Sequence, residues 1–430
     1  MRVLLSAYAC EPEKGSEPAV GWNWVRQIAR FHEVWVITRA NNQEPIEKAL
    51  ASSPLPNAHW VYFDLPCRMR FWKKGERGLH PYYYLWQLGA CFVARKLHRM
   101  VGFDLVHHVT FVNYWMPSFL VLLPIPFVWG PVGGGESAPR AFWRSFSFRG
   151  KVFELLRDLA RRLGEFDPFV RLSARRATPG LATTYQTKER LRALGSRSAS
   201  VFSQVGLPEE DICKLGAIPF RQSAPFRLIS MGNLLHWKGF ELGLRAFGLF
   251  SQQFPTSEYW VVGDGPERKR LERVARRLGI GERVTFWGAL PRSEAMEKLS
   301  ESDVLVHPSL HDSGGWVCLE AMAAGRPVIC LDLGGPALQV TEDVGIKVPA
   351  ISPGSVVDDL AEAYRLASDP ELRARLSVGA RKRVQEHFNW DKKGLLMREV
   401  YESLPTVEKA KADNFAHMRR ERATIDSETS

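Results

Sequence analysis

The sequence lacks the patterns by which cysteines hold metal ions or close disulfide frameworks. It has only six cysteines in 430 residues, and no two of them form a Cys-x-x-Cys pair. Their scatter along the chain argues against a zinc site and a disulfide-stapled domain. It is typical of a protein in a reducing cytosol.

Long apolar runs are also missing. The longest, FLVLLPIPFVW at 119–129, is too short to span a bilayer and contains two prolines. We therefore predict no transmembrane helix. The opening residues, MRVLLSAYAC, lack the charged, apolar and small-residue segments that together mark a signal peptide, and we interpret them as a buried strand.

Two absent motifs limit the chemistry. No Asp-x-Asp pair occurs, so a common pair of metal-binding carboxylates is missing, and we expect no metal. No Gly-x-Gly-x-x-Gly fingerprint occurs either, which disfavours a dehydrogenase. GPVGGGES at 130–137 has the glycine spacing of a phosphate-binding P-loop, but Glu136 replaces its essential lysine. We interpret it as a cleft loop in which Glu136 contacts an acceptor.

Positive charge is in excess and unevenly placed. The net charge is +11, and basic residues mix with aromatic ones in two stretches, 60–100 and 140–176. Basic segments with aromatic anchors suit an anionic membrane surface, which we favour as the partner. A solvated helix face is the first alternative. Nucleic-acid binding is the least favoured interpretation of this positive charge, and we predict no nucleic-acid partner.

Strand, turn and helix patterns repeat along the chain and predict an α/β protein with doubly wound parallel sheets. The length exceeds what one hydrophobic core usually supports, so we expect two domains. The alternation of strand and helix patterns stops at 206–225, a segment rich in Gly and Pro. The end of the chain is polar and has no apolar face. The predicted parts are a first domain at 1–205, a linker at 206–224, a second domain at 225–386 and a disordered tail at 405–430.

The strongest motif is HDSGGWVCLEAMAAGRP at 311–327. A strand runs into a Gly-Gly turn and then into a helix that begins near Trp316. Backbone N–H groups at such a turn bind anions without any side-chain charge. Asp312 and Glu320 add two carboxylates, and Glu320 is placed to accept hydrogen bonds from ribose hydroxyls.

Three further motifs also follow predicted strands, where parallel sheets bind ligands. They are CEPEKGSEPAVGWNW at 10–24, DLVHHVT at 104–110 and MGNLLHWKG at 231–239. In DLVHHVT, His107 and His108 are neighbours on a strand, so only one of them can face the crevice. We favour His108 and expect the other to be packed in the core.

These motifs resemble those of the family 4 retaining glycosyltransferases. HDSGGWVCLE is similar to the family's Glu-x7-Glu motif, and the EAMAAGRPV that continues it is also typical of the family. MGNLLHWKG resembles its Gly-Arg-Leu-x3-Lys-Gly loop, and residues 10–24 resemble its glycine-rich first loop. The resemblance implies the GT-B fold, in which two Rossmann-like domains face a central cleft. It also implies a last helix, at 387–404, that crosses back to the first domain.

The resemblance implies roles for single residues. Glu320 would bind the donor ribose, and Asp312, which stands in place of the family's first Glu, would bind the sugar. Lys238 would clamp the diphosphate, whereas Asn233 stands where the family has an arginine. The implied donor-site residues are Gly15, Asn233, Lys238, Gly314, Gly315, Trp316 and Glu320. The implied catalytic residues are His108, Lys238, Asp312 and Glu320. Glu17, at a helix start, is an expected acceptor contact, like Glu136.

The sequence therefore predicts a retaining hexosyltransferase that uses a UDP- or GDP-linked sugar, needs no metal or cofactor, and acts at the cytoplasmic face of the plasma membrane. Its acceptor would be lipid-linked or a saccharide, in polysaccharide or glycolipid biosynthesis. Two alternatives remain. One is a sugar-nucleotide epimerase of the same fold. The other is a catalytically impaired binding protein, which the replacements at Asn233 and Asp312 favour.

Overall fold

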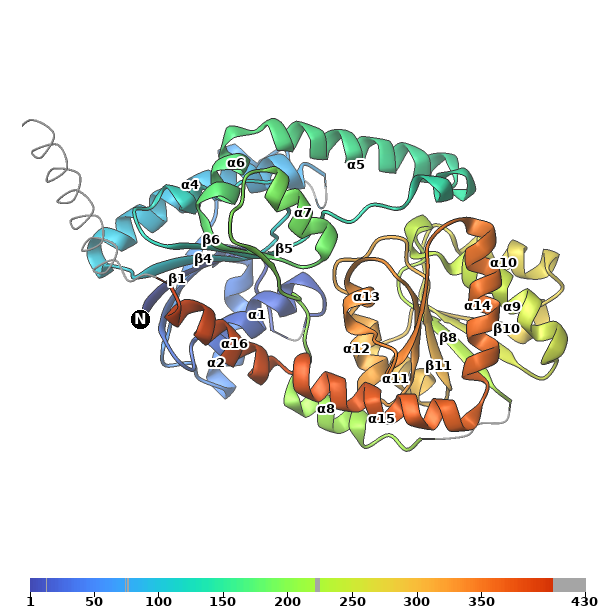
Figure 1. The fold of residues 1–430 in the computed structure, drawn as a ribbon. Coiled ribbons are helices and arrows are strands. Elements are labelled where there is room, and N and C mark those ends of the chain that lie inside the picture. Colours follow the sequence, from blue (N-terminus) through green and yellow to red (C-terminus); the bar gives the residue numbers. More distant parts are fainter. Residues whose placement is uncertain (13, 74, 76, 221–224, 405–430) are drawn as a thin grey trace, which may run out of the picture.

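The computed structural model describes residues 1–12, 14–73, 75, 77–220 and 225–404. The tail predicted to be disordered, at 405–430, lies outside the described residues. The chain forms two sheets with helices on both faces (Figure 1). Within both sheets, neighbouring strands always run parallel. The predicted fold class is confirmed.

The first sheet has seven strands in the order β3-β2-β1-β4-β5-β6-β7. They are β1 (Arg2–Ala7), β2 (Glu33–Arg39), β3 (Ala58–Phe63), β4 (Leu105–Thr110), β5 (Phe127–Val132), β6 (Ala177–Ala182) and β7 (Ala199–Val201). The helices of this half are α1 (Glu17–Ile28), α2 (Gln43–Ser52), α3 (Cys67–Arg70), α4 (Leu79–Val101), α5 (Phe148–Phe166), α6 (Pro168–Arg176) and α7 (Tyr185–Ala193).

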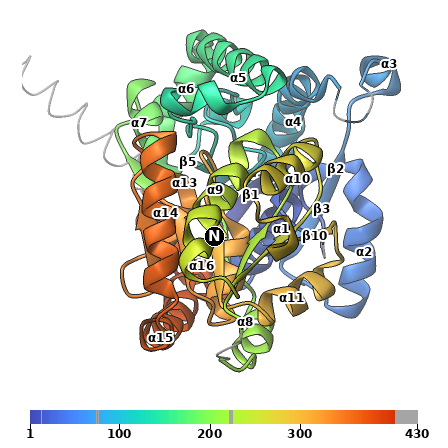
Figure 2. The same ribbon diagram turned by 90° about the vertical axis from the view of Figure 1, so that its right-hand side faces the viewer.

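The second sheet has six strands in the order β10-β9-β8-β11-β12-β13. They are β8 (Arg227–Met231), β9 (Glu258–Val262), β10 (Val284–Gly288), β11 (Val304–His307), β12 (Val328–Leu331) and β13 (Gly345–Val348). The helices of this half are α8 (Glu209–Gly216), α9 (Phe240–Gln253), α10 (Arg268–Arg277), α11 (Arg292–Ser300), α12 (Trp316–Ala323), α13 (Gly334–Gln339), α14 (Pro353–Ala367) and α15 (Pro370–His387). The last described helix, α16 (Trp390–Glu402), lies against the first domain. Figure 2 views the molecule from the second domain, with α9 and α14 in front of the sheet.

The central strands are apolar along their whole length because helices cover both faces of each sheet. Strands β4, β5, β11 and β12 are buried at every position. Such continuous burial is typical of parallel sheets, in contrast to the alternation of half-exposed antiparallel strands. Both faces of β4 are therefore core, which matters for its two histidines.

Two elements join the domains outside the sheets. Helix α16, near the end of the described chain, packs on α1 of the first domain, where the rings of Trp24 and Trp390 meet edge to face at 5.1 Å. The Gln27 amide donates to Asp391 in the same contact, at 2.9 Å. Helix α5 extends from the first domain across to the second (Figure 1). None of the described helices is long and apolar enough to cross a membrane.

Candidate active site

A cleft of about 1170 Å³ opens between the two domains. The loops that follow β1, β8 and β11 line it. In the first sheet the strand order reverses between β1 and β4, and in the second between β8 and β11. Such switch points are where open α/β sheets bind ligands. The predicted residues that line this cleft are Gly15, Glu17, Asn233, Lys238, Asp312, Gly314, Gly315, Trp316 and Glu320.

Asp312 is the centre of a network on the second-domain wall. Its Oδ2 accepts from Lys238 Nζ at 2.5 Å and lies 3.2 Å from His307 Nε2. Its Oδ1 accepts from the backbone amides of Gly314 and Gly315 at 3.1 and 3.0 Å. Burial raises the pKa of this carboxyl, but Lys238 and His307 outweigh burial and hold the pKa well below its usual range. Asp312 is therefore ionised.

This network changes the predicted role of two glycines. The amides of Gly314 and Gly315, which were expected to bind a diphosphate, already donate to Asp312. Beyond them, Trp316 and Val317 occupy the first positions of α12, where an amide has no acceptor within its own helix. The positive end of α12 thus points its free amides into the cleft, which both residues line.

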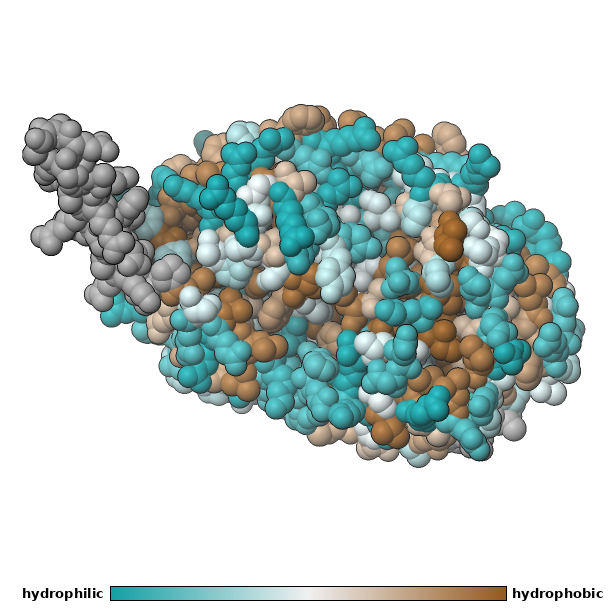
Figure 3. All heavy atoms as spheres, viewed as in Figure 1, coloured by the Kyte–Doolittle hydropathy of each residue, from teal (hydrophilic) through white to brown (hydrophobic). Residues whose placement is uncertain are grey.

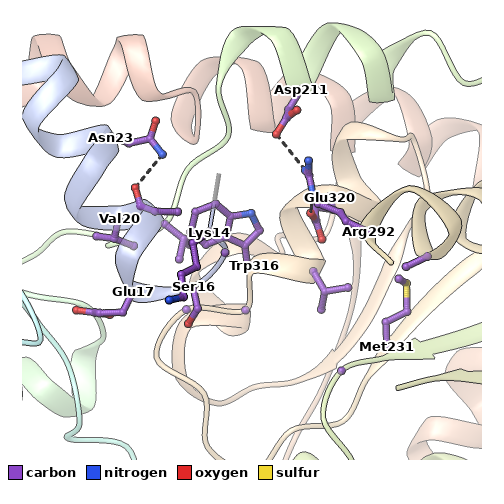
Figure 4. A pocket seen from close by; sticks show the side chains of 18 of the residues that line it. Lys14, Ser16, Glu17, Val20, Asn23, Asp211, Met231, Arg292, Trp316 and Glu320 are labelled. Carbon is purple, nitrogen blue, oxygen red and sulfur yellow. Dashed lines mark hydrogen bonds and ion pairs between the residues drawn. The ribbon is translucent and has the colours of Figure 1, made fainter. Parts of the chain in front are cut away.

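Glu320 lies one helical turn further along α12 and is held by an arginine that the sequence reading missed. Arg292 Nε donates to Glu320 Oε1 at 3.0 Å, and Arg292 Nη2 donates to Asp211 Oδ2 at 3.0 Å (Figure 4). Burial raises the pKa of Glu320 above its usual value, and Arg292 offsets only part of that rise. The sequence position of Arg292 could have identified it, because Arg292 begins α11 directly after the loop that follows β10.

The loop after β8 presents Asn233 and Lys238 to the cleft. Asn233 supplies no positive charge there. The other cationic residues of the lining are Lys14, Arg26 and Arg292. Of these, Lys14 is paired with Glu11 at 2.8 Å, and Arg292 with two carboxylates. Gly239, which follows Lys238, has φ 69° and touches the Pro308 carbonyl so closely that a Cβ would clash, so this loop is tied to the one after β11.

The first-domain wall contains Gly15 and Glu17. A Cβ built on Gly15 would meet nothing within 4 Å, so protein packing does not require a glycine at this exposed position. Glu17 lines the cleft, but its Oε1 accepts from the Phe111 amide at 2.6 Å. Phe111 has a φ of 57°, a costly value for a residue with a side chain. Glu17 therefore fixes the backbone just after β4, and Figure 4 shows it directed away from Trp316.

The prediction that His108 faces the cleft is wrong. His108 is 1% exposed, and its Nε2 lies 2.9 Å from Tyr83 Oη and 3.2 Å from Gln87 Nε2 of α4. His107 points to the opposite face, where Nδ1 lies 2.6 Å from Tyr401 Oη and Nε2 lies 2.6 Å from the Gly130 carbonyl. The physical reason is that β4 is a central strand, so both of its faces are core.

Glu136 is not free for an acceptor either. It is 2% exposed, and it accepts from Thr184 Oγ1 at 2.5 Å, Thr187 Oγ1 at 2.8 Å and Ser313 Oγ at 2.7 Å. Burial raises its pKa, but these hydrogen bonds more than offset burial and lower the pKa. Because Ser313 follows Asp312, Glu136 links the first domain to the second-domain motif.

Glu154 of α5 makes a second link between the domains, which the sequence reading also missed. Its Oε1 lies 3.1 Å from His236 Nε2 and 3.1 Å from His311 Nε2, and it is 1% exposed. Burial raises its pKa, but the hydrogen bonds with the two histidines outweigh burial, and the pKa is lowered. His236 belongs to the Lys238 loop and His311 precedes Asp312. One carboxylate of the first domain thus joins both motif loops of the second.

Comparison with solved structures identifies the fold. Sucrose-phosphate synthase from Thermosynechococcus elongatus superposes with a TM-score of 0.63 at 20% identity, covering 93% of this chain and 98% of that one. HepE from Anabaena, solved in complex with UDP-glucose, superposes with a TM-score of 0.58 at 17% identity, covering 94% of this chain and 100% of that one. The protein has the GT-B fold.

The second domain of this GT-B protein carries a family signature. Residues 217–383 match the family model of glycosyl transferases group 1. The lipopolysaccharide core biosynthesis glycosyltransferase LpsD of Rhizobium meliloti is 34% identical over 164 residues, which are 38% of this chain and 46% of LpsD. The chain spans less than half the length of the curated relatives it matches. Within the described ranges, no group of three His, Cys, Asp or Glu residues could hold a metal ion.

Proposed function

We propose that the protein is a retaining glycosyltransferase. It moves a sugar from a nucleotide-sugar donor to a lipid-linked or saccharide acceptor in polysaccharide or glycolipid biosynthesis. The observation that carries the proposal is that Lys238, Asp312, Glu320 and the N-terminus of α12 share one wall of the interdomain cleft. The curated name of LpsD, a lipopolysaccharide core biosynthesis glycosyltransferase, and the UDP-glucose bound to HepE support the proposal.

The donor would bind with its ribose against Glu320. Glu320 is buried, with 9% of the residue exposed, and its carboxylate is oriented by Arg292. A ribose hydroxyl that donates to this carboxylate therefore gains a hydrogen bond to a charged group. Arg292 also neutralises part of the negative charge that Glu320 and Asp211 place beside an anionic nucleotide.

The diphosphate would lie between Lys238 and the first turn of α12. Free backbone amides and the helix dipole favour an anion there, and Lys238 supplies a full positive charge. Lys238 and Asp312 form an ion pair, so a donor diphosphate would compete with Asp312 for Lys238. The released carboxylate is then available to the sugar hydroxyls, the role that the family resemblance gives it.

Chemistry would proceed on one face of the sugar. The bond from the anomeric carbon to the phosphate oxygen breaks, and a bond to the acceptor oxygen forms on the same side. The acceptor proton passes to the leaving phosphate. Positively charged and dipolar groups that are fixed in place stabilise the leaving charge, usually the largest catalytic contribution. In this scheme Lys238 and the α12 amides stabilise the leaving group without a metal ion.

The proposal is tested by incubating the protein with labelled UDP- and GDP-sugars, with and without a membrane lipid extract. We expect label to move to the extract and nucleoside diphosphate to be released, with loss of both in Lys238→Ala. Lys14→Ala, the same change at another cleft lysine, is the matched control. Conversion of the donor sugar without transfer would indicate an epimerase, and tight donor binding without turnover a binding protein. Either result would reject the proposal.

A further inference from the structure

The outer face of α5 carries a continuous apolar stripe. Eight large apolar side chains of this helix are between 38% and 81% exposed. One of them, Phe153, stacks on Trp237 of the second domain. The other seven form the stripe: Phe148, Val152, Leu155, Leu156, Leu159, Leu163 and Phe166. On a helix of about 3.6 residues per turn, these positions fall within a stripe roughly 100° wide. A soluble surface rarely exposes so many large apolar side chains side by side, and such patches mark interaction sites.

The opposite face of α5 is fixed to the body of the protein. Arg161 donates to the backbone carbonyls of Gly134 and Glu136, and Glu154 bridges the two motif histidines. Gly150 and Gly164 lie on this inner face too, where a Cβ would meet His236 and the Trp115 backbone. These contacts settle which face of α5 is outward. Figure 1 shows the helix along one edge of the molecule, and Figure 3 shows hydrophobic (brown) residues among hydrophilic ones on that edge.

Charge on the flanks of the stripe identifies its occupant. Arg149, Lys151 and Arg162 are exposed and border the apolar side chains on both sides. Asp158, four residues before Arg162 on α5, lies 3.6 Å from Arg161 and so is already paired. Apolar side chains between cations match a lipid interface with anionic headgroups. Two copies of this chain joined through their stripes would instead place cationic flanks against each other.

We propose that the outer face of α5 docks on an anionic lipid surface, with its apolar stripe below the headgroups and its flanking cations among them. The purpose of this docking rests on the proposed function, since a lipid-linked acceptor must be met at the bilayer. Because the inner face of the same helix holds His236 and His311, docking sets the position of both motif loops relative to the membrane. The proposal also locates the binding within the second basic stretch, 140–176.

The test is co-sedimentation of the full-length protein with vesicles, without donor or acceptor. We expect binding to mixed phosphatidylglycerol and phosphatidylcholine vesicles, little binding to phosphatidylcholine alone, and weakening as salt rises. Replacing three stripe leucines by glutamine (L155Q, L159Q and L163Q) should weaken binding roughly tenfold or more, since each leucine loses its burial in lipid. Arg149→Gln with Arg162→Gln should abolish the preference for anionic vesicles.

The matched control is a double change elsewhere, Ile351→Gln with Val378→Gln. These two residues of the second domain are 72% and 70% exposed, so the control removes apolar surface of the same kind. Circular dichroism melting shows that each variant folds. Equal vesicle binding by the wild type and the stripe variant would overturn the proposal. So would a wild-type dimer in solution that the stripe variant dissociates. Since no sugar transfer is measured, failure here is distinct from failure of the proposed function.

Discussion

Glu154→Gln tests whether the link between α5 and the two motif loops positions the donor site. The substitution keeps the size of the side chain and removes its charge. In the native protein one carboxylate oxygen serves both His236 and His311 at 3.1 Å, and the other lies 3.7 Å from Arg157. An amide oxygen still accepts hydrogen bonds from the histidines, but without charge assistance, and the amide nitrogen faces a guanidinium.

The magnitude follows from these contacts. A hydrogen bond to a charged group contributes about 1.5–3 kcal/mol and a neutral one about 0.5–1.5 kcal/mol, so the two histidine contacts together lose about 2 kcal/mol. Because these bonds join the two domains, their loss destabilises the observed domain arrangement relative to one in which the domains are further apart. About 2 kcal/mol corresponds to roughly a thirtyfold shift between the two arrangements, which sets an upper limit on the rise in donor KM.

Steady-state kinetics of sugar transfer measure the effect, and small-angle scattering reports the distance between the domains. Glu165→Gln is the matched control, because it makes the same change on the same helix. Among the described residues, the side chain of Glu165 bonds Tyr114 and Arg190, which both belong to the first domain. We expect a higher donor KM and a larger radius of gyration for Glu154→Gln alone. Identical KM and scattering for the two variants would refute a positioning role for Glu154.

Three further predictions concern charge and pH. Lys238→Ala should lower kcat at least tenfold, because a cation on the leaving diphosphate is worth about 1.5–3 kcal/mol, and an unchanged kcat would remove Lys238 from the leaving-group site. Transfer should survive excess EDTA, and loss that magnesium or manganese restores would contradict metal-free catalysis. Burial lowers the pKa of His107 to about 4 and of His108 to about 3, from 6.5. The unfolded chain therefore binds more protons, so stability should be full above pH 6.5 and fall toward pH 4. Urea unfolding at pH 7 and pH 5 measures this fall, and His108→Gln should reduce it.

The fold could be predicted because its determinants are local. Strand patterns followed by loops and helices specify parallel sheets, and sites in parallel sheets form at the carboxyl ends of strands. Residues in loops after β8 and β11, such as Lys238 and Asp312, accordingly line the cleft, while their roles stay predictions. The network around Asp312 was not predicted. Asp312 accepts hydrogen bonds from the amides of its own turn, and whether it does so depends on its side-chain conformation, which the sequence does not specify.

The failures have a common physical cause. His108 and Glu136 were assigned to the cleft from their position after or near a strand end, but partners far along the chain bury them. Glu136 bonds Thr184 and Thr187, which are 48 and 51 residues away. Glu154 reaches His311 across 157 residues. A periodic pattern shows which face of a helix is polar, but not which distant residue lies opposite that face.

The most direct test of the proposed donor site is calorimetric binding of UDP and GDP to the wild type and to Glu320→Gln. One of the two nucleotides should bind the wild type, and Glu320→Gln should weaken that binding about tenfold or more, through loss of a charge-assisted bond worth about 1.5–3 kcal/mol. Glu210→Gln, the same change at an exposed carboxylate of the cleft lining, should leave the affinity unchanged. Equal nucleotide affinity in the wild type and Glu320→Gln, or no binding of either nucleotide to the wild type, would contradict the proposed donor site.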